Sequence, residues 1–147
     1  MRADKILLPV DFSTSDRIAL KTATSLARDT GALLIILHVE EPPLAYGAGD
    51  LYYGQPDPTS DELREMLELV RPKDAQIRCE HRLKTGDPAD SIVRVAEAEA
   101  VDLIVMSTHG RTGVSRLLMG SVAEAVVRRA KCPVLTVKQP EGESAME

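Results

Sequence analysis

The segment 107–121, STHGRTGVSRLLMGS, contains residue types that suit the binding of a small anion. It has three glycines, Gly110, Gly113 and Gly120. Because glycine has no side chain, the backbone N–H groups of such a segment can approach an anion closely. Gly120 and Ser121 also precede an amphipathic segment, and the start of a helix offers N–H groups and a favourable dipole. With Arg111 and Arg116 as sources of positive charge, the segment is a candidate phosphate-binding loop.

A second polar segment, residues 9–13, follows the first apolar run of the chain. Its Asp11 is suited to accept hydrogen bonds from the hydroxyls of a ribose. These residues also have structural interpretations, which the sequence leaves open. Ser121 is a suitable helix N-cap, and Asp11 can cap a helix or bond to its own loop. His109 fits a polar loop residue, because it has no neighbouring metal-ligand pattern, and the arginines fit a solvated surface.

Five segments predict the strands that would position these loops. Four are short, continuous apolar runs, which are typical of parallel strands covered on both faces, at residues 5–10, 33–39, 103–106 and 133–138. The fifth, residues 75–83, alternates apolar and charged residues from Ile77 onward. That alternation is typical of an edge strand with one face in water.

Four amphipathic segments predict helices, at residues 14–31, 59–70, 87–100 and 120–131. The hydroxyls of residues 13–15 are expected to cap the first helix. Asp87 and Pro88 are typical of the start of the third. Ser121 and Glu124 have the spacing of a capping box at the start of the fourth. The regular alternation of strands and helices predicts an α/β fold.

We expect a single-domain, five-stranded parallel sheet in the order 3-2-1-4-5, with helices on both faces and right-handed crossovers. Ligands of such sheets bind beyond the carboxyl ends of the strands, where the strand order reverses. Strand 1 then lies beside strand 4, so the loop after residue 9 faces the loop after residue 106. The domain is expected over residues 1–140, with a surface loop at 41–58 and a disordered acidic tail at 141–147.

The composition argues against several classes of function. The chain has 147 residues, a hydrophobic content of 44% and a formal net charge of −5. That charge is unfavourable for binding nucleic acid or an acidic membrane, and only 3% of the residues are aromatic. The N-terminal apolar run is too short for a signal peptide or a membrane span. We therefore expect a cytoplasmic protein, with Cys79 and Cys132 as reduced thiols.

The order of several segments resembles the universal stress protein family over about residues 3–138. They are KILLPVDFS, a second strand ending in LHV, GDPADSIV, VDLIVMSTHGRTG and LLMGSVAEAVVRRAKCPVLTVK. ATP-binding members carry a glycine, two residues, a glycine, nine residues, and then glycine with Ser or Thr. Gly110 and Gly120-Ser121 match the later positions, whereas Ser107 replaces the first glycine. The resemblance implies a Rossmann-like fold of the adenine-nucleotide alpha-hydrolase-like type.

The resemblance also implies a function: an ATP-binding, homodimeric regulatory or stress-response protein with little or no catalytic turnover. Asp11 would bind the ribose, Val39 and Met106 would contact adenine, and Mg²⁺ would bridge the phosphates with little protein ligation. Dimers would pair through the last strand, residues 133–138. The implied nucleotide-binding residues are Pro9, Val10, Asp11, Val39, Met106, Ser107, His109, Gly110, Arg111, Gly113, Gly120, Ser121 and Val122.

Other functions remain open at this point. One is slow ATP hydrolysis, for which His109 is the candidate general base. Another is an interaction module of the same fold that binds no nucleotide. A flavin site is disfavoured, because such sites sandwich the ring between aromatic residues, and the only aromatic cluster is Tyr46, Tyr52 and Tyr53 in the predicted surface loop.

Overall fold

The computed structural model describes residues 2–42, 57–109 and 119–138. Within these residues the elements are β1 (Lys5–Pro9), α1 (Ser15–Thr30), β2 (Leu33–Glu40), α2 (Ser60–Leu69), β3 (Cys79–Thr85), α3 (Pro88–Ala98), β4 (Leu103–Ser107), α4 (Ser121–Arg129) and β5 (Val134–Val137). The predicted surface loop at 41–58 falls mostly outside the described residues, and the predicted tail at 141–147 falls outside them entirely. None of the described helices is both long and apolar enough to cross a membrane.

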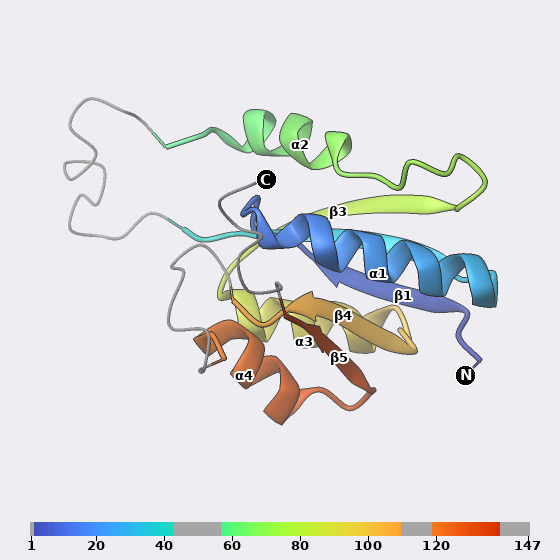
Figure 1. Ribbon diagram of the computed structural model, residues 1–147. Helices are drawn as coiled ribbons and strands as arrows, with labels where there is room; N and C mark the ends of the chain where they lie inside the picture. The colour runs from blue at the N-terminus through green and yellow to red at the C-terminus, as the bar shows by residue number, and fades with distance from the viewer. Residues whose placement is uncertain (1, 43–56, 110–118, 139–147) are drawn as a thin grey trace.

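The strands form one parallel sheet in the order β3-β2-β1-β4-β5, which confirms the predicted order. Figure 1 shows α1 and α2 on one face of the sheet and α3 and α4 on the other. The order reverses at β1, because β2 and β3 extend the sheet to one side and β4 and β5 to the other. The fold therefore places the predicted ligand edge at the carboxyl ends of β1 and β4.

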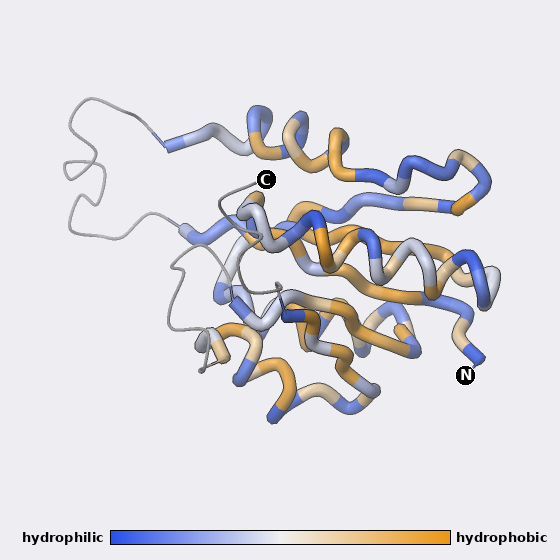
Figure 2. Tube along the Cα trace, viewed as in Figure 1, coloured by the Kyte–Doolittle hydropathy of each residue, from blue (hydrophilic) through white to orange (hydrophobic). Residues whose placement is uncertain are grey.

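Alternation along each strand divides the core into two layers. Ile6 and Leu8 of β1 pack toward α1 and α2, whereas Leu7 packs toward α3 and α4. These three side chains have no exposed surface. Figure 2 shows hydrophobic residues along the central strands. Burial on both faces explains why the central strands read as continuous apolar runs.

The strand β3 lies at the sheet edge as predicted, but it begins later than predicted. The sequence pattern started it at residue 75, whereas the strand begins at Cys79. Asp74 accounts for the difference, because its Oδ1 accepts a hydrogen bond from the backbone N–H of Gln76 at 2.9 Å and its carbonyl accepts one from Ile77 at 3.2 Å. These bonds form a turn that delays the strand.

Helix starts agree with the sequence where a side-chain cap is present. Asp87 caps α3 by accepting a hydrogen bond from the backbone N–H of Asp90 at 2.9 Å, and Pro88 follows it, as predicted. A capping box of Thr59 and Glu62, which the sequence analysis missed, opens α2. Met66 of α2 is 36% exposed, whereas Leu63 and Leu67 of the same helix are buried.

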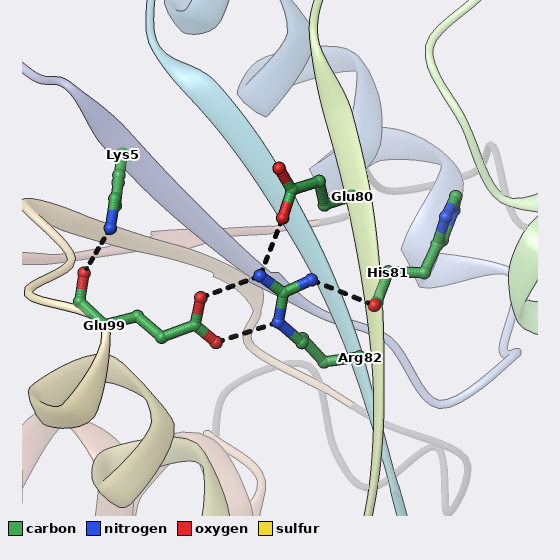
Figure 3. Close-up of polar contacts among 5 residues, drawn as sticks. All are labelled: Lys5, Glu80, His81, Arg82 and Glu99. Carbon is green, nitrogen blue, oxygen red and sulfur yellow. Dashed lines mark hydrogen bonds and ion pairs between the residues drawn. The ribbon is translucent and has the colours of Figure 1, made fainter.

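Charged side chains connect β1 and β3 to the end of α3, as Figure 3 shows. Arg82 of β3 donates to both carboxylate oxygens of Glu99, at 3.0 and 2.9 Å, and to Glu80 at 2.7 Å. Lys5 donates to the backbone carbonyl of Glu99 at 3.0 Å. These four residues, Lys5, Glu80, Arg82 and Glu99, are called the Arg82 cluster below. Arg82 contacts the carboxylates of both Glu80 and Glu99 in this cluster.

Candidate functional site

The candidate site lies at the carboxyl edge of the sheet, between β1 and β4. The pairing of β1 with β2 continues to Pro9 and Leu37, whereas the pairing of β1 with β4 ends at Leu7 and Ile104. The last residues of β1 and β4 are thus unpaired with each other. This is the position where open parallel sheets bind ligands.

The chain leaves β1 through a tight turn. The backbone N–H of Val10 donates to the carbonyl of Leu37 at 2.8 Å, so Val10 still follows β2. Asp11 is partly buried, and its Oδ1 accepts a hydrogen bond from the backbone N–H of Ser13 at 3.0 Å. Phe12 has a φ of 64°, a left-handed conformation that is unusual for a bulky residue. The turn leaves Asp11 at the carboxyl edge of the sheet.

The side chain of Asp16 holds this turn from within α1. Its Oδ2 accepts hydrogen bonds from the backbone N–H groups of Phe12 at 2.6 Å and Asp11 at 3.2 Å. Asp16 is only 9% exposed. The predicted hydroxyl capping of α1 is wrong, because Thr14 is the N-cap residue but its side chain makes no capping bond. The Asp16 carboxylate in the first turn of α1 instead accepts from N–H groups of the turn that precedes the helix.

The environment of Asp16 favours its neutral form. Burial, and then the charge of Asp11, raises the pKa of Asp16 from 3.8 to about 7. The two backbone N–H donors act in the opposite direction, and a hydrogen bond with the Asp11 carboxyl raises the pKa further. Asp16 therefore holds its proton to a higher pH than an ordinary aspartate. Buried, like-charged pairs of this kind are enriched at functional sites.

His38 of β2 supports the same turn from the sheet. Its Nδ1 lies 2.8 Å from the carbonyl oxygen of Val10, so Nδ1 carries the hydrogen and donates it. Its ring centroid is 4.4 Å from that of Phe12. In the same turn, Ser13 Oγ is buried and has no hydrogen-bond partner among the described residues. An unsatisfied buried hydroxyl of this kind calls for a partner that a ligand or water can supply.

At the end of β4, Thr108 joins three elements. Its backbone N–H donates to the carbonyl of Val137 at 3.0 Å, and its carbonyl accepts from the N–H of Gly120 at 2.7 Å. Ser107 Oγ donates to the carbonyl of His109 at 3.0 Å. The bond from Gly120 to Thr108 brings together the two ends of the predicted phosphate loop.

Helix α4 begins at Ser121, with Gly120 as its N-cap residue. The predicted capping box is wrong, because Ser121 lies inside the helix and the N–H of Glu124 bonds to the carbonyl of Gly120 at 2.9 Å. No side chain caps α4. Gly120 has φ −64° and ψ 156°, which any residue can adopt, so the backbone does not require glycine there.

Three of the predicted site residues belong to one apolar cluster. Val39 of β2 and Met106 of β4 are 9% and 6% exposed, and both lie in the core layer that faces α3 and α4. Val122 of α4 packs against the same layer. Val10, in contrast, belongs to the layer on the α1 side. The structure therefore brings Val39, Met106 and Val122 together and places Val10 across the sheet from them.

Other predicted residues are only partly described. Pro9 ends β1 and is partly buried. His109 is also partly buried, and its Nδ1 lies 3.2 Å from the Thr108 hydroxyl. Gly110, Arg111 and Gly113 lie outside the described residues.

Sequence reasoning missed Asp16, Thr108 and His38. The signal for Asp16 was a carboxylate in the first turn of a helix, which usually indicates a favourable interaction with the helix dipole. Thr108 and His38 had no local signal, because their contacts join segments that are distant in the sequence.

A second hollow, of about 460 Å³, lies between the end of β3 and α3. Asp90, which lines it, is paired with Arg94 and Arg129, both at 2.9 Å. Two guanidinium groups therefore offset the charge of Asp90. Within the described ranges, no group of three or more His, Cys, Asp and Glu side chains could hold a metal ion.

The arrangement at the carboxyl edge of β1 and β4 suits a ligand with three kinds of surface. The Asp11 carboxylate can accept hydrogen bonds from hydroxyls. The start of α4 favours an anion. Val39 and Met106, at the ends of β2 and β4, and Val122 of α4 supply apolar surface to the same core layer.

Comparisons with known proteins agree with this architecture. Residues 2–138 match the model of the universal stress protein family. The chain is 35% identical to Universal stress protein MJ0531 of Methanocaldococcus jannaschii, over 95% of this chain and 84% of that protein.

Two solved structures extend the comparison. That of the protein MJ0577 superposes with a TM-score of 0.81 at 30% identity, covering 97% of this chain and all of the other. A universal stress protein in complex with cAMP superposes with a TM-score of 0.63 at 26% identity, covering 93% and 98%. With the family match spanning almost the whole sequence, this chain belongs to the universal stress protein family.

Proposed function

We propose that the chain binds ATP at the carboxyl edge of β1 and β4 and acts as a homodimeric regulatory protein with little or no catalytic turnover. The observation that carries the proposal is the juxtaposition of Thr108 and Gly120, which are hydrogen-bonded at 2.7 Å. That bond holds the start of α4 at the end of β4, beside the strand that leads into Asp11.

The chemistry of the described residues fits an adenine nucleotide. Asp11 would accept hydrogen bonds from the ribose hydroxyls. Because the N–H of Gly120 already donates to Thr108, the N–H groups of Ser121 and Val122 in the first turn of α4 would bind phosphate. Val39 and Met106 would contact the adenine ring. The choice of glycine at position 120 supports a close approach by a ligand, because its φ and ψ values do not require glycine.

The complex of a related universal stress protein with cAMP gives independent support for an adenine nucleotide. We assign the remaining loop residues Gly110, Arg111 and Gly113 to the phosphate end on the basis of the family motif. The Ser107 hydroxyl bonds to the carbonyl of His109, so its interaction is local. When bound, Mg²⁺ would neutralise part of the phosphate charge, with most of its ligands coming from phosphate and water.

The test is titration calorimetry of the full chain with Mg–ATP, alongside the Gly120→Val variant. Valine tolerates the extended φ and ψ values of Gly120, so we expect the variant to fold. Its side chain would occupy the space of a phosphate, and its affinity should fall by at least about tenfold, a change of about 1.4 kcal/mol in binding free energy.

The matched control is Gly31→Ala at the end of α1. Gly31 has a φ of 76°, so alanine there should lower stability without changing affinity for Mg–ATP. Absence of binding by the unaltered chain, or equal binding by Gly120→Val, would overturn the proposed nucleotide site. The chain would then be studied as an interaction module.

Dimerisation is proposed through β5, which pairs with β4 on one side only among the described strands. Leu135 of β5 is 38% exposed and Val127 of α4 is 45% exposed. An apolar edge strand is a ready surface for pairing with a second copy. We expect Leu135→Lys to sediment as a monomer. Leu69→Lys, at an 83% exposed leucine of α2, should sediment like the unaltered chain.

A further inference from the structure

The peptide group between Val10 and Asp11 is held at both of its polar ends by side chains. Its carbonyl, that of Val10, accepts a hydrogen bond from Nδ1 of His38 at 2.8 Å. Its N–H, that of Asp11, donates to Oδ2 of Asp16 at 3.2 Å. His38 belongs to β2 and Asp16 to α1, so two elements fix one peptide plane. Because a peptide group is planar, this also fixes the direction in which the backbone enters Asp11.

The hydrogen bond from His38 lies where the backbone pairing of β1 with β2 ends. Pro9 pairs with Leu37, and the N–H of Val10 donates to the carbonyl of Leu37 at 2.8 Å. The carbonyl of Val10 then accepts from the imidazole of His38, whose side chain lies in the interior with the residue 9% exposed. The turn that carries Asp11 thus begins at the residue that His38 holds.

His38 also contacts the residue on the other side of Asp11. The centroid of its ring is 4.4 Å from that of Phe12, and the two ring planes are inclined by 42°. Phe12 has a φ of 64°. Such a backbone conformation is unfavourable for a bulky residue, persists only where neighbouring contacts impose it, and is concentrated at ligand-binding sites. Asp11 therefore lies between two residues that His38 contacts, Val10 and Phe12.

Asp16 restrains the same turn through different groups. Its Oδ2 accepts from the N–H groups of Asp11 and Phe12, at 3.2 and 2.6 Å, whereas His38 holds the carbonyl of Val10. Asp11 and Asp16 are called the Asp11–Asp16 pair below. Loss of the bond from His38 would leave the N–H groups held and release the Val10 carbonyl. The effect would therefore fall on the orientation of Asp11, which would still lie at the sheet edge.

We propose that His38 is a positioning residue of the nucleotide site, which orients Asp11 toward the ribose hydroxyls through its hydrogen bond to the carbonyl of Val10. This inference rests on the proposed function, in which Asp11 accepts hydrogen bonds from those hydroxyls. His38 acts through the backbone of Val10 and has no assigned contact with the nucleotide. An acceptor that is already oriented loses less free energy to ordering when the ligand binds. His38 therefore governs how strongly the chain distinguishes a ribose from a sugar without hydroxyls.

The experiment is titration calorimetry of the full chain with two probes, Mg–ATP and Mg–2′,3′-dideoxy-ATP, which lacks both ribose hydroxyls. The ratio of the two affinities isolates the contribution of the hydroxyls, because the base and the phosphates are the same in both probes. We expect the unaltered chain to bind Mg–ATP about tenfold more tightly, because hydrogen bonds to a charged acceptor are among the stronger ones.

Two variants of His38 separate its hydrogen bond from its ring. Asparagine places a side-chain N–H near the position of Nδ1, whereas glutamine places it near that of Nε2. Both lack the ring, so both lose the contact with Phe12. We expect His38→Asn to keep the ratio of affinities near the value of the unaltered chain. His38→Gln should lower the ratio to about twofold, while its affinity for the dideoxy probe changes by less than about twofold.

The matched control is His81→Asn. His81 of β3 also bonds to a backbone carbonyl, that of Val70 at 2.7 Å, but it does so at the end of α2 and through Nε2. Asparagine does not reach the position of Nε2, so this variant removes a similar bond outside the site and should keep the full ratio. Urea denaturation checks that each variant is folded. If His38→Gln does not fold, His38→Phe keeps the ring, lacks the donor and should show the same lowered ratio.

The outcomes separate this inference from the proposed function. An unchanged ratio in His38→Gln, even where both probes bind more weakly, would overturn the role of His38 and leave the nucleotide site standing. Equally lowered ratios in His38→Asn and His38→Gln would also overturn it, because the hydrogen bond would not be the cause. Equal binding of both probes by the unaltered chain would overturn it and leave the phosphate end of the site. Absence of Mg–ATP binding would overturn the site and this inference together.

Discussion

The Arg82 cluster and the Asp11–Asp16 pair are two groups of charged side chains that the fold treats in opposite ways. In the Arg82 cluster, one guanidinium donates to two carboxylates, and Lys5 donates to the backbone of Glu99 (Figure 3). In the turn after β1, the Asp16 carboxylate accepts hydrogen bonds from the backbone N–H groups of Asp11 and Phe12, and the Asp11 carboxylate accepts one from Ser13. The first arrangement offsets its charges, whereas the second concentrates charge of one sign.

Burial sharpens this difference. The side chains of Arg82 and Glu99 are 28% and 23% exposed, so water screens part of their interaction. Asp16 is 9% exposed, and burial of this kind disfavours its charged form. An interaction that serves stability alone is expected to resemble the Arg82 cluster. Two acidic side chains beside the ligand-binding edge of the sheet are instead expected to serve ligand binding.

The largest expected effect is the pH dependence of stability in Asp16→Asn. The folded state binds a proton on Asp16 up to about pH 7, whereas the unfolded chain releases it near 3.8. The stability of the unaltered chain should therefore decline as the pH rises between these values. Asp16→Asn does not ionise, so its stability relative to the unaltered chain should rise by about 3 kcal/mol from pH 5 to pH 8.

Urea denaturation at both pH values measures this change. Asp74→Asn is the control, because Asp74 is partly exposed and its hydrogen bonds with the N–H of Gln76 and with Arg28 lower its pKa below the ordinary value. Its stability should run parallel to that of the unaltered chain between pH 5 and pH 8. A parallel course for Asp16→Asn as well would mean that Asp16 is ionised in the folded chain over this pH range.

The sequence predicted the strands and helices on which both regions lie, but not the hydrogen bonds within either region. Apolar runs at β1 and β4, with polar residues directly after them, were enough to predict the strand order and the ligand edge. The hydroxyls at residues 13–15 suggested the wrong cap for α1, because a local pattern shows which side chains can cap and not which one does. The burial that raises the pKa of Asp16 arises because α1 packs against the sheet.

The local sequence pattern was also insufficient to predict how α4 and β3 begin. Ser121 and Glu124 have the spacing of a capping box, yet Gly120 is the N-cap residue, and its N–H donates to Thr108. Thr108 is 12 positions from Gly120 in the sequence, so no short window contains this contact. At β3, the Asp74 turn delays the strand although the alternating pattern is already present.

The next largest effect is expected for Arg82→Met. The variant keeps much of the side-chain length but leaves Glu80 and Glu99 without the guanidinium. We expect a loss of about 2 kcal/mol in the free energy of unfolding at pH 7, because charged hydrogen bonds contribute more than neutral ones and part of the site is in water. Affinity for Mg–ATP should change by less than about twofold, within about 0.4 kcal/mol.

Arg128→Met is the control for the loss of a surface cation. Arg128 pairs with Glu124 at 2.6 Å, but the two side chains are 74% and 57% exposed. Its loss should change stability by less than about 0.5 kcal/mol. If Arg82→Met abolished nucleotide binding while the protein stayed folded, the Arg82 cluster would belong to the ligand site and the comparison would fail.

The smallest effects separate the two carboxylates of the Arg82 cluster. Glu99 contacts Arg82 through both oxygens and is 23% exposed, whereas Glu80 makes one contact at 2.7 Å and is 51% exposed. Paired contacts fix the guanidinium in one orientation, and lower exposure reduces screening by water. We expect Glu99→Gln to lower stability by about 1 kcal/mol and Glu80→Gln by less than about 0.5 kcal/mol. Urea denaturation in 0.05 and 0.5 M NaCl should show the Glu80 effect vanish first, and equal losses would mean that a single contact to Arg82 is sufficient.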